Sequence, residues 1–174
     1  PALVVTKPDA PRGRGRKIYP QEVMLKATDL ELPVEQPEDV HSPEFMDKLR
    51  SMDFDIGVVI CYGVVMQEAL FNMPKKGSIN AHASLLPLYR GAAPIQVTIR
   101  DAHEKTGVTI IKIGEKLDAG DVMLVAEHPI KAKTTAGVLR KELSELSGQA
   151  LVSALQAIAA GTETFTPQDH ALAS

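Results

Sequence analysis

Apolar runs of strand length recur along this chain and alternate with segments of helical pattern. The runs predict strands at residues 2–6, 56–62, 77–81, 107–113 and 122–126, with a weaker candidate at 32–35 that contains a proline. The run from Ile56 to Tyr62 has no charged residue, which is typical of a strand covered on both faces. We therefore expect it to be a central strand, with Cys61 as a buried thiol rather than a reactive one.

Helices are predicted between these strands, at residues 21–30, 43–52, 66–72, 92–102 and 134–160. The second has the clearest start, because Ser42 is a good N-cap and Pro43 suits the first helical position. The last is the longest, and its apolar residues recur every three or four positions, so they share one face. That face comprises Leu139, Leu143, Leu146, Ala150, Ala154 and Ile158.

Strands that alternate with helices predict an α/β fold, with a mainly parallel sheet and helices on both of its faces. The segments 107–113 and 122–126 follow each other without a helix between them, which predicts an antiparallel addition. Residues 7–20 are expected to be a loop, because prolines and glycines recur in them. Residues 161–174 show little periodicity and are expected to form a tail.

The composition bounds the class of protein. The 174 residues suffice for one domain with a sizeable core, and no apolar run approaches the ~20 residues of a membrane helix. No signal-peptide pattern is present. We expect a cytoplasmic protein that acts as a monomer and has no membrane partner. A single cysteine excludes an internal disulfide, and the scattered histidines lack metal-ligand spacing, so no metal is expected.

Charge is spread unevenly along the chain. The formal net charge is −3, yet residues 7–17 carry five basic residues against one acidic residue. Glycines interrupt this basic segment at Gly13 and Gly15, and glycine lets a backbone approach a sugar–phosphate chain closely. The segment therefore predicts contact with an anion, and a solvated flexible loop is the alternative.

The segment from Asn80 to Gln96, Asn-Ala-His-Ala-Ser-Leu-Leu-Pro-Leu-Tyr-Arg-Gly-Ala-Ala-Pro-Ile-Gln, carries the most chemistry. Asn80 and His82 are two residues apart at the end of a predicted strand, so they point to the same face. An amide donor beside an imidazole could stabilise an oxyanion and move a proton. Taken singly, Asn80 could equally cap a turn, and His82 could be a structural histidine.

This segment resembles the formyltransferases that use 10-formyltetrahydrofolate, whose active-site strand ends in Asn-x-His and continues as Ser-Leu-Leu-Pro. The continuation from Arg90 to Gln96 is similar to the branch of that family that formylates methionyl-tRNA. Leu117-Asp118-Ala-Gly120 matches the Leu-Asp-x-Gly motif that carries the family's catalytic aspartate. The resemblance covers residues 2–172.

The resemblance implies a Rossmann-like fold and transfer of a formyl group from 10-formyltetrahydrofolate to the amino group of initiator methionyl-tRNA. Asn80 and His82 would donate to the developing oxyanion. Asp118 would keep His82 charged and oriented, and could take the proton that the attacking amine sheds. The folate site would be lined by Ser84, Leu85, Leu86 and Pro87.

The basic segment is similar to the mobile insertion loop of the same branch, so Arg14, Arg16 and Lys17 would contact the tRNA. The family's first strand and its C-terminal domain find no counterpart here. We therefore expect residues 1–160 to be an N-terminally truncated catalytic domain, and residues 161–174 to be a tail leading to a missing C-terminal domain.

Two kinds of alternative remain open. The same site could serve another acceptor, such as glycinamide ribonucleotide or an amino-sugar nucleotide, or could hydrolyse formyltetrahydrofolate with water. An alternative of another class is a non-catalytic module that binds folate or RNA.

Overall fold

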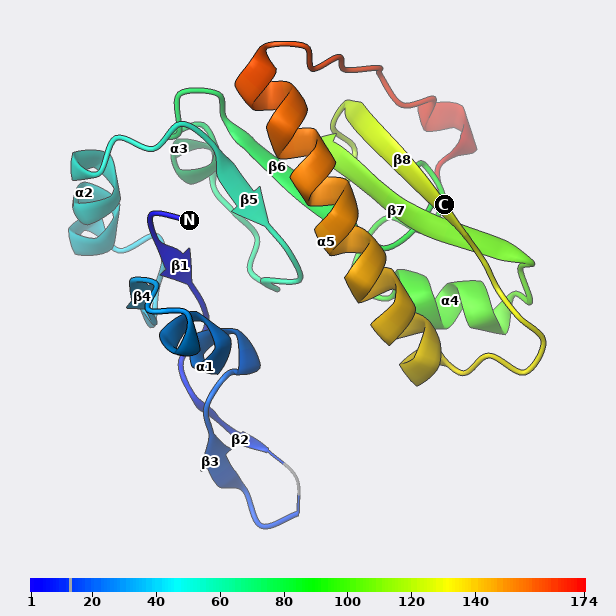
Figure 1. The fold of residues 1–174 in the computed structure, drawn as a ribbon, viewed down its shortest axis with the longest axis horizontal. Helices are drawn as coiled ribbons and strands as arrows, with labels where there is room; N and C mark the ends of the chain where they lie inside the picture. Colours follow the sequence, from blue (N-terminus) through cyan, green and yellow to red (C-terminus); the bar gives the residue numbers. More distant parts are fainter. Residues whose placement is uncertain (13) are drawn as a thin grey trace. The chain divides into compact units, whose positions relative to one another are not determined.

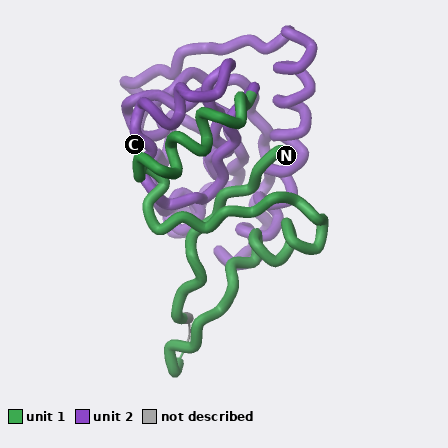
Figure 2. The backbone as a smooth tube through the Cα atoms, turned by 90° about the vertical axis from the view of Figure 1, so that its left-hand side faces the viewer, with its two compact units in different colours: residues 1–54 green, residues 55–174 purple. Residues whose placement is uncertain are grey.

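A computed structural model describes residues 1–12 and 14–174, except the side chain of Arg12. The predicted role of Gly13 therefore lies outside the described residues. Backbone contacts divide the chain into two units, Pro1–Phe54 and Asp55–Ser174, coloured separately in Figure 2.

Two pairs of short strands and two helices form the first unit. Strand β1 (Val4–Val5) pairs in parallel with β4 (Val34–Glu35), and helix α1 (Glu22–Asp29) lies between them in sequence. Helix α2 (Pro43–Ser51) begins as predicted, because the Ser42 hydroxyl accepts a hydrogen bond from the Phe45 N–H at 3.4 Å. Its buried face consists of Phe45, Met46 and Leu49.

The expectation of a loop over residues 7–20 needs correction, because a hairpin lies within it. Strands β2 (Ala10–Arg12) and β3 (Lys17–Tyr19) pair antiparallel and extend from the rest of this unit as a narrow arm (Figure 1). Gly15 and Arg16 have positive φ angles of 99° and 48°, which help to reverse the chain. Pro11 is tolerated in β2 because a two-stranded hairpin has only edge strands.

The second unit is built on a four-stranded sheet in the order β5-β6-β7-β8. Strands β5 (Gly57–Val59) and β6 (Ser78–His82) are parallel, whereas β7 (Lys105–Lys112) runs antiparallel to both β6 and β8 (Val122–Pro129). The predicted antiparallel addition is therefore present, and the predicted α/β class is confirmed. The helices of this unit are α3 (Glu68–Phe71), α4 (Pro94–Arg100), α5 (Ala136–Ala160) and the short 3-10 helix η1 (His170–Leu172).

Helix α5 forms the core of this unit with one face of the sheet, across which it runs in Figure 1. Thr135 caps its start by accepting from the Val138 N–H at 3.4 Å, and Gly161 ends it in a left-handed conformation. The predicted apolar face is buried as expected, except that Leu146 lies at the margin of the core and is partly buried. The sheet contributes Ile79, Ala81, Val108 and Ile110 to the same core.

The prediction of a central strand over residues 56–62 is wrong in length and position. Only Gly57–Val59 pairs, and β5 is an edge of the four-stranded sheet. Val58 is 42% exposed, and Cys61 is an exposed thiol rather than a buried one. The chain leaves the strand direction at Cys61, which has a φ of 47°, so the rest of the apolar run continues as surface.

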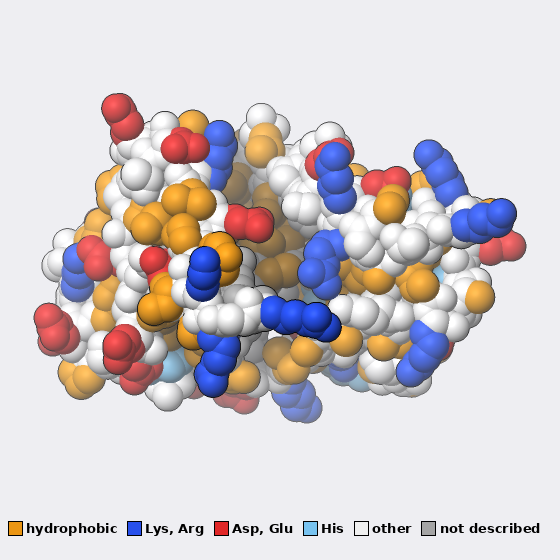
Figure 3. Space-filling model, turned by 90° about the horizontal axis from the view of Figure 1, so that it is seen from below, with side chains coloured by type: hydrophobic (Ala, Val, Ile, Leu, Met, Phe, Trp, Pro, Cys, Tyr) orange, Lys and Arg blue, Asp and Glu red, His pale blue; other side chains and the backbone are white. Residues whose placement is uncertain are grey.

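The surface carries both charged and apolar side chains, and Figure 3 shows basic and acidic groups scattered between hydrophobic patches. Helix α5 has 25 residues, but neither it nor any other described helix is a candidate membrane span.

We expect Leu143→Ala to lower the free energy of unfolding by about 2–5 kcal/mol, because it leaves a cavity between α5 and the sheet. Leu143 is 1% exposed, whereas Val152 on the same helix is 56% exposed. Urea unfolding measures the effect, and Val152→Ala is the control, with an expected change within about 0.5 kcal/mol. Similar losses in both variants would contradict this packing.

Candidate active site

Strand β6 fixes the direction of the two predicted donors. Ile79 and Ala81 belong to the core under α5, so the alternation of a strand directs Asn80 and His82 toward the opposite face. Neighbouring strands hold this register, because Asn80 stands opposite Ile111 of β7, and His82 stands opposite Thr109. The two side chains therefore come from a rigid part of the fold.

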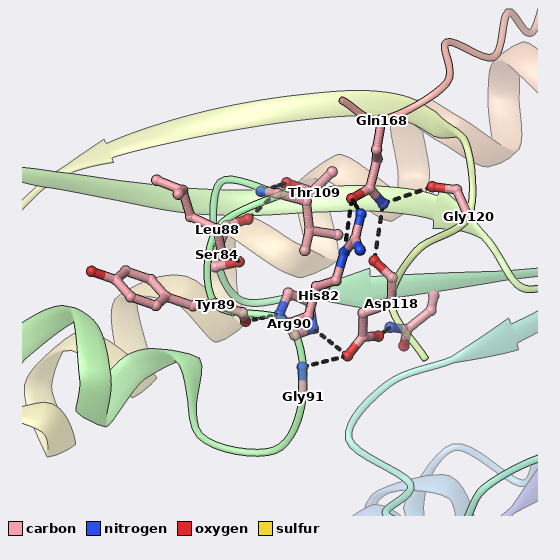
Figure 4. Close-up of polar contacts among 12 residues, drawn as sticks. His82, Ser84, Leu88, Tyr89, Arg90, Gly91, Thr109, Asp118, Gly120 and Gln168 are labelled. Atoms are coloured by element: carbon pink, nitrogen blue, oxygen red, sulfur yellow. Dashed lines mark hydrogen bonds and ion pairs between the residues drawn. The ribbon is translucent and has the colours of Figure 1, made fainter. Parts of the chain in front are cut away.

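The loop between β7 and β8 brings the predicted carboxylate to these two side chains. The Asn80 amide donates to Asp118 Oδ1 at 3.3 Å. His82 Nδ1 lies 3.4 Å from Asp118 Oδ2, as Figure 4 shows. The backbone N–H of Gly91 also donates to Oδ2, at 2.9 Å. The structure thus brings together all three residues predicted to be catalytic, and adds Gly91, which sequence reasoning missed.

Burial makes these contacts strong. The side chain of His82 is 6% exposed and that of Asp118 is 10% exposed, so the ion pair is largely withdrawn from water. An ionised carboxylate only accepts hydrogen bonds, and here both oxygens face donors. Asp118 has a φ of 48°, a left-handed conformation that is sparsely populated outside glycine, although aspartate tolerates it better than most residues.

The surroundings of the imidazole define where its protons lie. His82 Nε2 is 2.8 Å from the carbonyl oxygen of Tyr89, which can only accept, so Nε2 carries a proton. Nδ1 faces the Asp118 carboxylate, which also accepts. Each ring nitrogen of His82 therefore faces an acceptor. An oxyanion that binds His82 would have to replace the Tyr89 carbonyl. The Asn80 amide makes one hydrogen bond within the described part of the chain, to Asp118, and has a second hydrogen to donate.

Side-chain contacts hold Tyr89, the residue whose backbone carbonyl faces His82. Its hydroxyl donates to Asp101 Oδ2 at 3.0 Å, and its ring meets that of His103 edge-on, with centroids 5.5 Å apart. Desolvation, followed by the hydrogen bond to Asp101, raises the pKa of the Tyr89 hydroxyl. The hydrogen bond from Arg100, followed by that from Tyr89, lowers the pKa of Asp101. Contacts at the end of α4 therefore help to hold the carbonyl that binds His82.

The segment 84–87, which is predicted to line a folate site, alternates between buried and partly exposed residues. Ser84 is fully buried and donates to the Leu88 carbonyl at 2.6 Å, and Leu86 is 9% exposed. Thr109 of β7 donates to the Ser84 carbonyl at 2.7 Å and accepts from the Leu86 N–H at 3.1 Å. Ser84 and Leu86 thus shape the loop from inside, while Leu85 and Pro87 keep exposed surface. Their contact with a folate stays a prediction.

Gln168, in the segment predicted to be an irregular tail, also reaches this site. It is 7% exposed, and its amide N–H groups donate to the carbonyls of Asp118 at 2.9 Å and Gly120 at 2.7 Å. Its oxygen accepts from the guanidinium of Arg90. No spacing or periodicity in the sequence pointed to Gln168, and only the fold brings it to the site.

A cavity of about 270 Å³ adjoins the Asp118 loop. Its lining consists of Gly114, Glu115, Lys116, Ala119, Gly120 and His170. A more open cavity of about 590 Å³ beside α3 is lined by Gln67, Glu68, Ala69 and Asn72, and offers no cluster of reactive groups. Among the described residues, no three potential metal ligands come together.

The predicted nucleic-acid contacts lie on the hairpin of the first unit. Arg14, Arg16 and Lys17 are exposed at or next to its turn, where they can reach a ligand in solution. No contact in this structure tests their binding to RNA.

The comparisons with known proteins give the family of this α/β chain. Residues 1–155 match the family model described as Formyl transferase, so the chain belongs to the formyl transferase family.

The names of the curated relatives are more specific than the family description. The chain is 41% identical to the methionyl-tRNA formyltransferase of Moorella thermoacetica, over 99% of this chain and 56% of that protein. It is 44% identical to the protein of the same name from Chromohalobacter salexigens, over 94% of this chain and 50% of that protein. The chain therefore spans about half the length of the curated relatives it matches.

Solved structures support the fold. The phosphoribosylglycinamide formyltransferase from Bacillus halodurans has a TM-score of 0.74 at 22% identity, over 90% of this chain and 79% of that chain. The formyltransferase PseJ from Anoxybacillus kamchatkensis, solved with a UDP-sugar and tetrahydrofolate, has a TM-score of 0.68 at 22% identity, over 97% of this chain and 81% of that chain. These similarities confirm the predicted Rossmann-like formyltransferase fold.

We expect Gly120→Ala to disrupt the Asp118 loop, because a Cβ at Gly120 would lie 1.8 Å from the backbone carbonyl oxygen of Lys112 in β7. The loop would have to move away from the strand, at a cost of about 1–3 kcal/mol in the free energy of unfolding. Gly148→Ala in α5 is the matched control, since a Cβ there meets no atom within 4 Å. The control should be stabilised by about 0.5–1 kcal/mol in urea unfolding, and equal stability of the two variants would contradict the close approach.

Proposed function

We propose that the protein to which this chain belongs transfers a formyl group from 10-formyltetrahydrofolate to the amino group of methionyl initiator tRNA. The observation that carries the proposal is the convergence of Asn80, His82 and Asp118 in one partly buried site. Identity of about 40% to proteins named methionyl-tRNA formyltransferase supports the choice of acceptor.

The three side chains suit a reaction in which an amine attacks a formyl carbon. The formyl oxygen gains negative charge as the amine adds, and the Asn80 amide and His82 Nε2–H are donors that could stabilise that charge. Asp118 faces Nδ1 and can thereby orient the imidazole. A proton must also leave the attacking amine, and Asp118, which faces Asn80 and His82, could accept it directly or through water. The bond between the formyl carbon and the folate nitrogen then breaks, and that nitrogen takes up a proton as tetrahydrofolate leaves.

The residues around the site fit a folate. When bound, 10-formyltetrahydrofolate supplies an activated formyl group. Leu85 and Pro87 offer apolar surface, and the loop from Gly114 to Gly120 offers backbone groups beside a cavity. A flat heterocycle with a polar edge needs both kinds of surface. We assign the folate side of the site to these two loops.

Charge supports the tRNA contact. Arg14, Arg16 and Lys17 are exposed on a hairpin, where cations can displace the counterions of a phosphate chain. We propose that this hairpin meets the tRNA acceptor end. A protein that acts on initiator tRNA works where translation takes place, so we propose a cytoplasmic enzyme. We also propose that it acts as a monomer.

Another acceptor is the second candidate, because solved structures of the same fold include enzymes named for glycinamide ribonucleotide and for sugars. The Arg14 hairpin favours tRNA over both. Formyl transfer assayed in parallel with charged initiator tRNA, glycinamide ribonucleotide, a UDP-amino sugar and water alone separates these activities from hydrolysis. Binding without any turnover would indicate a non-catalytic module.

Removing any of the three polar side chains should slow formyl transfer. For Asn80→Ala we expect a loss of about 100–1,000-fold in kcat, the usual effect of deleting one donor to an oxyanion. His82→Ala and Asp118→Ala should be impaired at least as strongly, because each also removes half of the ion pair. His128→Ala is the control, since His128 forms a separate ion pair with Glu142 and should keep normal kcat. Near-normal rates in the three site variants, with folding verified, would refute the assignment.

Arg14→Ala should weaken binding of charged tRNA and leave folate binding unchanged. Loss of one phosphate contact should lower the slope of log K against log salt concentration by about 1. The measurement is a tRNA titration at several salt concentrations. Lys141→Ala on the exposed side of α5 is the control, with an unchanged slope. An equal loss of folate binding in Arg14→Ala would indicate misfolding instead of a lost contact.

A further inference from the structure

Gln168 is a buried side chain whose hydrogen-bonding capacity is fully used. Its two amide hydrogens go to two carbonyls, those of Asp118 at 2.9 Å and Gly120 at 2.7 Å. Its oxygen accepts twice from Arg90, from Nε at 3.2 Å and from Nη2 at 2.7 Å. A surface glutamine would leave such bonds to water, so this arrangement fixes the segments that it joins.

The segments joined by Gln168 are those that determine the position of Asp118. Gln168 holds the Asp118 carbonyl, and Arg90 immediately precedes Gly91, whose N–H donates to the Asp118 carboxylate at 2.9 Å. Gln168, Arg90, Gly91 and Asp118 therefore form a closed circuit of covalent and hydrogen bonds, which Figure 4 shows. The circuit constrains both the backbone and the carboxylate of Asp118.

Asp118 needs such a constraint. Its φ of 48° is a left-handed conformation, which persists where the surroundings determine it. Two carbonyls, at positions 118 and 120, are fixed by one amide, so the turn that carries the carboxylate cannot relax without breaking both bonds. The bonds reach across 50 and 48 residues of sequence, from the segment after α5 back to the loop between β7 and β8.

We propose that Gln168 is a positioning residue for formyl transfer, which acts through Asp118 on the orientation of His82 and Asn80. The inference rests on the proposed function of that site. Gln168 bonds to the backbone of the Asp118 turn and to Arg90, so its effect is on geometry and not on the reacting atoms. Displacement of a reacting group by about 1 Å can lower a rate about 100-fold.

Two substitutions separate the role of the Gln168 amide oxygen from that of its two amide hydrogens. Gln168→Glu keeps an acceptor for Arg90 but removes both hydrogens that hold the Asp118 and Gly120 carbonyls. Gln168→Met keeps the length of the side chain and removes both the oxygen acceptor and the N–H donors. Gln156→Met is the matched control, because Gln156 is exposed on α5.

The experiment uses the full natural protein that contains this chain, and measures kcat and KM for both substrates together with the ¹⁵N NMR signals of the histidine rings. We expect kcat about 100-fold lower in Gln168→Met and in Gln168→Glu, with KM for charged tRNA within about twofold of wild type. The ring signals of His82, assigned from their loss in His82→Asn, should shift in both variants, while those of His128 stay in place. Gln156→Met should match the wild type in every measurement.

Three results would overturn the proposal. Unchanged His82 signals and kcat in Gln168→Glu would show that the bonds to the Asp118 and Gly120 carbonyls position nothing. Shifts of His82 and His128 together, or a change confined to KM, would indicate a general structural role. Should Gln168→Met fail to fold, Gln168→Glu decides alone. A wild-type protein without formyl transfer would refute the proposed function, and the NMR comparison would still test the positioning.

Discussion

The site depends on the carboxylate of Asp118 and the donors that surround it. Asn80 and His82 approach it from strand β6, and the Gly91 N–H approaches it from the loop that follows. A largely buried carboxylate is stable as an anion only while such donors face it. The same contacts therefore satisfy the charge of Asp118 and fix the side chains that could act on a ligand.

The sheet makes this meeting possible. Strand β7 runs antiparallel to β6, so the connection from β7 to β8 begins beside the start of β6, where the Ile113 N–H donates to the Ser78 carbonyl at 2.8 Å. The connection then brings Asp118 to Asn80, a residue 38 positions earlier in the sequence. Close packing holds the turn, because Lys112 and Asp121 bond across it at 2.9 Å, and Gly120 lies against the Lys112 carbonyl. Helix α5 covers the other face of the sheet. The same strands therefore carry the core on one face and the polar site on the opposite face.

Several features could be predicted from the sequence because they depend on local rules. The α5 face follows from a regular apolar spacing, the start of α2 from Ser42 and Pro43, and the shared direction of Asn80 and His82 from strand alternation. The inclusion of Asp118 needed a family motif, because no local rule brings a turn residue to a distant strand.

Other features depend on tertiary contacts and escaped prediction. Cys61 lies in an apolar run, but exposure is decided by what covers a strand and where the chain turns. The bond between His82 and the Tyr89 carbonyl involves a backbone atom, which leaves no trace in residue identity. Gln168 is an ordinary polar residue in an irregular segment, and only the path of the chain after α5 makes it part of the site.

If the proposed function holds, the bond between His82 Nε2 and the Tyr89 carbonyl bears on selectivity between the ground state and the transition state. A neutral formyl oxygen accepts a hydrogen bond from this N–H about as well as the Tyr89 carbonyl does. Exchange of one acceptor for the other therefore gains little free energy. An oxygen that has become anionic is a much better acceptor than either. The imidazole would then favour the species with developed charge over the bound substrate, which is the difference on which catalysis depends.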